Sequence, residues 1–361
     1  MRLVLEKRAE HSLGMAILSP LIALALTVIA GGVIFALRGL DPFEALFVYF
    51  IEPLTQDWAR EQLIIKATPL VLIGAGLAVC YTANVWNIGA EGQFIAGALL
   101  AGMVPVFYPD WQSPEVMIVM LTLGILGGMA WAAIPALLKV RFGANEILSS
   151  LMLVYVAQYL FDWLVRGPWR DPQGFNFPKT RNFDGWQLLP KWGEIHLGAL
   201  FALIAALALA VVMWRMLKGF ELRVLGSAPR AGSFAGFSRN RALVFCFLLS
   251  GGLAGLAGAG DVMGVSGQLQ TPYSPNYGFV AIIVAFLGRL NPVGVIIAGL
   301  LLALSFIGGE SAQVTLGISD KIAKVFQGIL LFFILACDTL ILYRIRFDGR
   351  PASYAKPLER A

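Results

Sequence analysis

Charged residues and cysteines are scarce in this chain. Only 14% of its 361 residues are charged, whereas soluble domains carry about 25%. Cys80, Cys246 and Cys337 lie far apart in apolar surroundings and lack C-x-x-C spacing, so they predict neither a disulfide framework nor a metal site. The low charge content excludes an ordinary soluble domain.

Motifs for catalysis are missing as well. The sequence contains no G-x-x-x-x-G-K-[ST] phosphate loop and no H-E-x-x-H zinc motif. The two histidines, His11 and His196, stand apart from each other at expected membrane borders, which is unpromising for a ligand or a general base. We therefore expect no catalytic residue, no metal and no cofactor in this chain.

One acidic motif needs separate consideration. Gly258-Ala-Gly260-Asp261 is similar to the G-x-G-D of intramembrane aspartyl proteases. Those enzymes need a second aspartate that follows a tyrosine, because two carboxylates must share a proton. The nearest candidate, Asp162, follows Phe161, so we do not expect a protease.

Apolar sequence dominates instead. Hydrophobic residues make up 58% of the chain, and the mean hydropathy is +0.76. Runs that approach the length of about 20 residues needed to cross a bilayer lie near 15–37, 65–82, 92–107, 115–138, 147–165, 196–217, 242–261, 278–289, 292–308 and 323–343. This pattern predicts an all-α integral membrane protein of about ten transmembrane helices. The run at 278–289 is too short to span alone, which predicts a half-helix or one arm of a broken span.

The basic residues predict the orientation. Lys and Arg favour cytoplasmic loops, and an inside N-terminus places most of them there together with the C-terminal tail. The formal charge of +5 is spread over short loops between apolar runs. We therefore expect the lipid bilayer, and not nucleic acid, as the surrounding partner.

A polar, glycine-punctuated break at 84–98 separates two apolar runs. Polar groups at membrane depth are costly unless they face water, a ligand or another polar group. The candidates for lining a polar solute's path are Asn84, Trp86, Asn87, Glu91 and Gln93. The alternative is structural capping of the helix that starts near Glu91, because the helix dipole favours an acid in the first turn.

A second polar stripe follows Asn145 and Glu146, which are expected to cap a helix. The candidates on one face of that helix are Ser149, Met152, Tyr155 and Tyr159, with Gln158 beside them. Hydroxyls and rings of this kind could contact a base or a sugar. Packing within a helix bundle is the alternative.

Three further segments suggest surfaces. Segment 219–237 is long enough for a short helix, and its exposed apolar residues among charges suit docking to a soluble partner or, alternatively, an electrostatic role at the lipid surface. The loop 166–195 contains several tryptophans, which fits external docking or an aromatic belt. Residues 41–54 predict a helix in the outer interface or a buried tilted helix.

Two internal patterns concern packing. Segments 84–101 and 276–302 both start with asparagine, pass through a glycine-rich break and re-enter an apolar run, as the matched halves of transporters do. Small residues at Gly251, Gly252, Gly255, Gly258 and Gly260 predict close helix contact.

The break, taken together with Gly143-Ala-Asn145-Glu146-Ile-Leu-Ser149-Ser-Leu-Met152-Leu-Val-Tyr155, resembles the permease subunits of bacterial nucleoside-type ABC importers. These belong to the branched-chain amino acid, ribose and nucleoside permease group, which shows N-I-G-x-E-G-Q and G-x-N-E-[VI]-[IL]-[ST]-x-[IL]-M-L-N-Y. Val154 stands where the second pattern has asparagine. Residues 223–231 resemble the family's coupling segment, R-A-V-G-x-N-P-x-A, but have Ser-Ala before Pro229 where the family has x-Asn. Residues 235–237 resemble the A-G-[IF] that follows it. Residues 277–279 and 287–292 fit G-[FY] and L-G-x-x-x-P.

The resemblance implies a single transmembrane permease domain over 1–361 that imports nucleosides or related small polar solutes with energy from ATP. It implies a second related permease, a cytoplasmic ABC ATPase that binds ATP and Mg²⁺, and an extracytoplasmic solute-binding protein. The implied location is the bacterial inner membrane, with both termini cytoplasmic. The implied ATPase-coupling residues are Glu221, Arg223, Gly226, Pro229, Ala231 and Gly236. The alternative from a different class is a gradient-driven secondary transporter, which uses similar broken helices.

Overall fold

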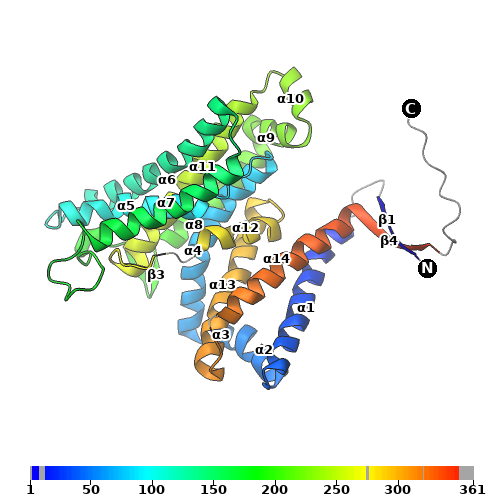
Figure 1. Cartoon of the computed structure of the whole chain (residues 1–361), viewed down its shortest axis with the longest axis horizontal. Coiled ribbons are helices and arrows are strands. Elements are labelled where there is room, and N and C mark those ends of the chain that lie inside the picture. Colours follow the sequence, from blue (N-terminus) through cyan, green and yellow to red (C-terminus); the bar gives the residue numbers. More distant parts are fainter. Residues whose placement is uncertain (1, 8–12, 274–275, 320, 349–361) are drawn as a thin grey trace. The chain divides into compact units, whose positions relative to one another are not determined.

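The computed structural model describes residues 2–7, 13–273, 276–319 and 321–348 (Figure 1). They form two compact units, one from residues 1–46 and 321–361 and the other from residues 47–320. His11 lies outside the described residues. The prediction of one permease domain over the whole chain stays a prediction.

The smaller unit pairs two long helices. Helices α1 (Leu13–Leu37) and α14 (Lys321–Leu342) pack together, and strands β1 (Arg2–Lys7) and β4 (Tyr343–Asp348) pair antiparallel with Arg2 opposite Asp348. The sequence analysis did not predict these strands. Helix α2 (Pro42–Phe50) lies across the boundary of the units in sequence.

The larger unit is a helix bundle. Its helices are α3 (Glu52–Thr55), α4 (Asp57–Thr82), α5 (Ala90–Phe107), α6 (Pro114–Phe142), α7 (Glu146–Arg166), α8 (Gly198–Arg215), α9 (Leu217–Ser227), α10 (Pro229–Phe234), α11 (Arg239–Asp261), α12 (Tyr277–Leu287) and α13 (Pro292–Leu316). A π-helical turn, Val262–Ser266, continues α11. Short elements in the long loop are a 3-10 turn at Gly185–Gln187 and the strand pair β2 (Lys191–Trp192) and β3 (Ile195–His196).

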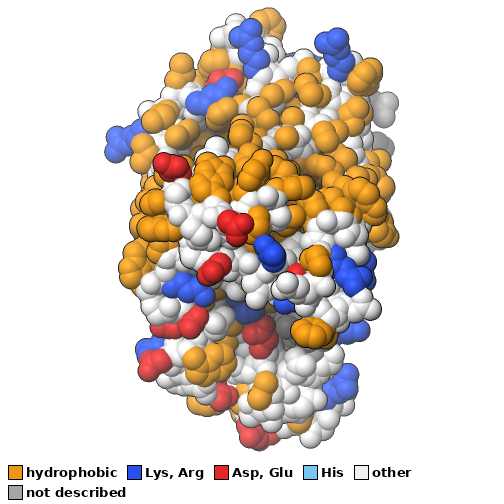
Figure 2. Space-filling model, turned by 90° about the vertical axis from the view of Figure 1, so that its left-hand side faces the viewer, with side chains coloured by type: hydrophobic (Ala, Val, Ile, Leu, Met, Phe, Trp, Pro, Cys, Tyr) orange, Lys and Arg blue, Asp and Glu red, His pale blue; other side chains and the backbone are white. Residues whose placement is uncertain are grey.

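The membrane architecture agrees with the predicted one. Each predicted apolar run coincides with a helix, and among the described residues seven helices are long and apolar enough to cross a membrane. Figure 2 shows broad areas of exposed hydrophobic side chains on one face, as expected of a protein surrounded by lipid. Helix α12 has 11 residues and so a length of about 16 Å, about half of a hydrocarbon core. It is therefore a half-helix.

Helix α11 forms the centre of the larger unit, where it packs against α4, α5 and α6. A Cβ atom added to Gly255 would meet the carbonyl oxygen of Gly124 on α6, and one added to Gly258 would meet that of Phe94 on α5. Such contact requires that the backbones approach closely, which small residues permit. The predicted glycine surface is confirmed at these positions, whereas a Cβ at Gly260 would meet nothing within 4 Å.

The interfacial helix predicted at 41–54 is divided into α2 and α3. Asp41 Oδ1 caps α2 by accepting hydrogen bonds from the backbone N–H groups of Phe43 at 2.8 Å and Glu44 at 3.4 Å. Phe43 is 85% exposed and Phe47 is 54% exposed. Tyr49 on the same helix is 0% exposed, so the choice between an interfacial and a buried tilted helix stays a prediction.

The long loop 166–195 is an ordered layer. Backbone N–H groups of Thr180, Phe183 and Leu189 donate to carbonyls of Leu269, Gly267 and Met263 at 2.7–3.0 Å. The loop therefore pairs with the segment that leads from α11 to α12. Its role as a docking surface stays a prediction.

His196 lies at the junction of this loop with α8. Its Nδ1 accepts the backbone N–H of Gly198 at 3.1 Å, and a Cβ at Gly264 would meet the imidazole ring. Burial, together with the charge of the nearby Lys191 ammonium, lowers the pKa of His196 to about 4. The ring is therefore neutral at pH 7, which its acceptor role at Nδ1 requires.

Helix contact at Gly255 predicts an asymmetric mutational response. Gly255→Ala should lower the free energy of unfolding by about 2 kcal/mol, because a rigid backbone cannot move away from the new methyl group. Gly260→Ala, on the same helix, should change stability by less than about 1 kcal/mol. Thermal unfolding in detergent measures both. Equal effects of the two substitutions would contradict the packing described above.

Burial of His196 predicts acid sensitivity. The unfolded chain binds a proton below pH 6.5, whereas the folded chain resists it down to about pH 4. The neutral ring's contribution to the free energy of unfolding is thus fully present above pH 6.5. It falls as the pH is lowered, by about 2 kcal/mol at pH 5. Tryptophan-fluorescence melting at pH 7 and pH 5 measures the loss. The His196→Gln variant should lack this part of the pH dependence, and an unchanged dependence would contradict the assignment.

Candidate functional site

The N-termini of two helices meet at Glu91. This residue lies in the first turn of α5 and is 0% exposed. Its Oε1 accepts the backbone N–H of Asn276 at 2.9 Å, and its Oε2 accepts that of Gly278 at 2.7 Å. Both donors belong to the N-terminus of α12. Glu91, which lies in the first turn of α5, therefore caps α12.

The contact between α5 and α12 is backbone to backbone. A Cβ added to Gly278 would meet the backbone atoms of Glu91. Asn276, the N-cap residue of α12, has a φ of 62° and makes no side-chain cap. Asn84 begins the other break with a φ of 55°. The two predicted breaks thus start with an asparagine in the same left-handed conformation.

Helix dipoles explain why a carboxylate occupies this place. The first N–H groups of a helix lack intrahelical partners and carry partial positive charge. Two such ends converge on Glu91, and hydrogen bonds to a charged acceptor are stronger than neutral ones. The carboxylate therefore holds the N-termini of α5 and α12 together.

Asn87 and Gln93 form an amide pair beside Glu91. Asn87 Nδ2 donates to Gln93 Oε1 at 2.9 Å, and Gln93 Nε2 donates to Asn87 Oδ1 at 3.0 Å. Asn87 Nδ2 also donates to Ser250 Oγ on α11 at 3.2 Å, and its Oδ1 accepts the N–H of Gly89 at 3.0 Å. Both amides are buried. In this conformation their hydrogen bonds fix the break against α11. The sequence analysis did not predict that Ser250 takes part.

A second carboxylate holds the segment before α12. Asp261, at the end of α11, accepts hydrogen bonds from Tyr273 Oη at 2.9 Å and from Ser266 Oγ at 3.4 Å. The Tyr273 ring lies between Phe161 of α7 and Phe94 of α5, at centroid distances of 4.7 Å and 5.8 Å. Asp261 is therefore an anchor of this segment. Asp162, considered above as its protease partner, pairs with Arg166 at 3.1 Å instead.

The remaining break candidates lie at the surface. Trp86 is 37% exposed, and its indole N–H donates to Asn84 Oδ1 at 2.9 Å. Its ring lies 5.2 Å from Tyr81 and 6.2 Å from Phe286, measured between centroids. Asn84 is exposed as well. These two residues are accessible, whereas Asn87, Glu91 and Gln93 are not.

The α7 stripe faces away from the bundle. Met152, Tyr155 and Tyr159 are exposed, and Ser149 and Gln158 are half-buried. The opposite face packs against α5, because a Cβ at Gly92 would meet the backbone of Val154 and one at Gly89 would meet Ser150. Packing inside this chain therefore does not explain the exposed stripe. Its contact with solute stays a prediction.

The predicted coupling segment folds into two short helices, α9 and α10, at one end of the bundle (Figure 1). Pro229 starts α10, and Ala231 and Gly236 are exposed. Glu221 pairs with Lys218 at 2.9 Å, and the Arg223 guanidinium donates to the carbonyl of Met213. The segment thus has an exposed tip and an anchored base.

Gly226 connects this segment to the break. A Cβ at Gly226 would meet the carbonyl oxygen of Thr82, at the end of α4, and the backbone of Ala83. The break that leads to Asn87 starts at that point. This contact joins α9 to the chain that leads to the amide pair. Among the described residues, no cluster of acidic, histidine or cysteine side chains could hold a metal ion.

Comparisons with known proteins agree with this architecture. Residues 59–335 match the family described as the permease component of the branched-chain amino acid transport system. The glucose ABC transporter permease protein TsgB13 of Haloferax volcanii is 34% identical over 96% of this chain and 95% of its own length. The guanosine ABC transporter permease protein NupP of Bacillus subtilis is 27% identical over 94% and 96%, and the nucleoside ABC transporter permease protein NupB of Lactococcus lactis is 25% identical over 88% and 90%.

The matched region contains both carboxylate anchors, the amide pair and the α9–α10 segment. Multiple apolar helices long enough to cross a membrane accompany it. The chain belongs to this permease family and is the membrane permease subunit of an ABC importer, as its motifs predict.

Proposed function

We propose that this permease imports nucleosides or related small polar solutes with energy from ATP. The observation that carries the proposal is the contact of Gly226 with the end of α4, because it joins an exposed docking segment to the polar break. Permease relatives are named for guanosine, for nucleosides and for glucose. A hexose is accordingly the second candidate solute, supported by the 34% identity to the glucose permease.

The proposed assembly contains a second related permease, a cytoplasmic ABC ATPase and an extracytoplasmic solute-binding protein. ATP and Mg²⁺ bind the ATPase chain, and this chain has no enzymatic activity of its own. The exposed tip of α10, with Ala231 and Gly236, supplies the docking surface, and Glu221 and Arg223 hold its base. Both termini are cytoplasmic, in the plasma membrane of a bacterium.

The proposed sites divide by accessibility. Glu91, Asn87 and Gln93 position the two breaks, because their polar groups bond within the protein in this conformation. The solute contacts are assigned to the accessible groups, which are Asn84, Trp86, Met152, Tyr155 and Tyr159, with Ser149 and Gln158 beside them. Movement of α9, driven by ATP at the ATPase, would shift the end of α4. This shift would open the solute path at the breaks first to the outside and then to the cytoplasm.

A substitution at Gly226 tests the coupling. The full complex in proteoliposomes loaded with ATP should take up labelled guanosine when the binding protein is present. Gly226→Val should reduce uptake at least about tenfold, because a new side chain pushes α9 from α4, while the ATPase remains bound. Gly260→Ala is the control and should leave uptake unchanged, because a Cβ there would meet nothing within 4 Å.

Competition in the same assay identifies the solute. Unlabelled nucleosides should suppress guanosine uptake, and suppression by glucose alone would favour the hexose. Uptake without ATP would contradict the proposed mechanism, and normal uptake by Gly226→Val with bound ATPase would contradict the coupling route.

A substitution at Glu91 tests the junction of α5 and α12. In Glu91→Gln, an NH₂ group replaces one of the two accepting oxygens. Because NH₂ cannot accept a hydrogen bond from a backbone N–H, one hydrogen bond to α12 is lost. Hydrogen bonds to charged groups contribute about 1.5–3 kcal/mol, and uptake should fall roughly tenfold or more while the complex still assembles. Glu115→Gln, which changes an exposed first-turn acid of α6, should leave uptake unchanged. Full uptake by Glu91→Gln would show that the carboxylate has no positioning role.

A further inference from the structure

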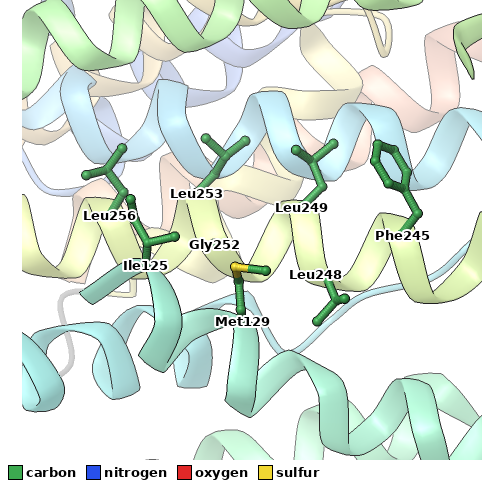
Figure 3. A pocket seen from close by; sticks show the side chains of 8 residues that line it. All are labelled: Ile125, Met129, Phe245, Leu248, Leu249, Gly252, Leu253 and Leu256. Carbon is green, nitrogen blue, oxygen red and sulfur yellow. The ribbon is translucent and has the colours of Figure 1, made fainter. Parts of the chain in front are cut away.

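An apolar groove lies between α6 and α11. It has a volume of about 380 Å³ and is lined by Ile125 and Met129 of α6 and by six residues of α11 between Phe245 and Leu256. Figure 3 shows Ile125 and Met129 reaching towards α11 at Gly252. The lining contains no charged side chain, so the occupant of this groove must be apolar along its length.

The length of the groove fits a hydrocarbon chain. From Phe245 to Leu256, α11 rises about 17 Å, close to half of the roughly 30 Å core of a bilayer. The apolar lining therefore extends over about the length of one leaflet, as an acyl chain does.

One end of the groove is basic. Arg241 lies one helical turn before Phe245, on the same face of α11, and it is exposed. Lys218 Nζ lies 4.9 Å from the centroid of the Phe245 ring and pairs with Glu221 at 2.9 Å. Arg241 and Lys218 therefore outnumber the one acid beside them, Glu221. This end therefore favours an anionic group.

We propose that this groove binds an anionic phospholipid. One acyl chain lies along α11 from Phe245 to Leu256, and the phosphate contacts Arg241 and Lys218. That the lipid comes from the cytoplasmic leaflet rests on the proposed function, which places α9 and α10 in the cytoplasm. Anionic lipids are enriched there and attract basic residues near the surface.

The position of the lipid connects it to transport. Lys218 belongs to α9, the helix that contacts α4 through Gly226. A phosphate on Lys218 competes with Glu221 for the ammonium group and so changes the base of the coupling segment. Phosphatidylglycerol should therefore change uptake by the complex relative to phosphatidylcholine.

Native mass spectrometry of the purified full chain in detergent with equal phosphatidylglycerol and phosphatidylcholine tests the binding. Wild-type protein should retain phosphatidylglycerol preferentially. Arg241→Gln should lower that preference about fivefold, since a basic residue near the surface contributes that much. Arg239→Gln is the matched control, because Arg239 lies on nearly the opposite side of the same helix end and should leave the preference unchanged.

A groove-filling variant tests the acyl-chain site. A Cβ at Gly252 would lie 3.1 Å from Met129 Cγ, a flexible side chain, so Gly252→Leu can fold and should reduce retention of both lipids. Equal retention of the two lipids by wild-type protein, or equal effects of Arg241→Gln and Arg239→Gln, would overturn the proposal. Dissociation of a permease pair by Gly252→Leu with lipid retention unchanged would assign the groove to a protein partner and overturn it as well. The measurement needs no ATPase. Failure of guanosine uptake would therefore contradict the proposed function without affecting the test of lipid binding.

Discussion

The junction of α5 and α12 depends on one buried carboxylate. A half-helix that starts inside a membrane protein leaves backbone N–H groups without partners, and no water is available to satisfy them. Glu91 accepts two of these N–H groups, those of Asn276 at 2.9 Å and Gly278 at 2.7 Å. Without this acid, these two N–H groups would each lose a hydrogen bond, and leaving a buried donor unpaired costs roughly 1–3 kcal/mol.

Other features of the larger unit support this junction. The amide pair of Asn87 and Gln93 fixes the approach to α5, and Asp261 fixes the approach to α12 through Tyr273. Close glycine contacts hold the backbone of α11 against the backbones of α5 and α6. Gly226 then brings the α9–α10 segment against the chain that enters the first break. The polar break and the α9–α10 segment are therefore parts of one connected structure.

Much of the fold could be predicted, because spans follow from local composition. Each apolar run became a helix, and Asn145 caps a helix as expected. The partners of Glu91 could not be predicted, since the N–H of Asn276 is 185 residues away and local reasoning favours the dipole of Glu91's own helix. Asp261 attracted attention only through its similarity to a protease motif, because its partner Tyr273 carries no signal of its own. The pairing of β1 with β4 joins the two ends of the chain, which no local pattern reveals.

Backbone hydrogen exchange at the start of α12 tests the central claim most directly. Peptides that contain residues 276–280 should be protected in the wild-type protein and should exchange much faster in Glu91→Ala, while peptides from α11 remain protected in both. This result is expected if the carboxylate holds the N-terminus of α12. Equal protection of residues 276–280 in the two proteins would contradict it.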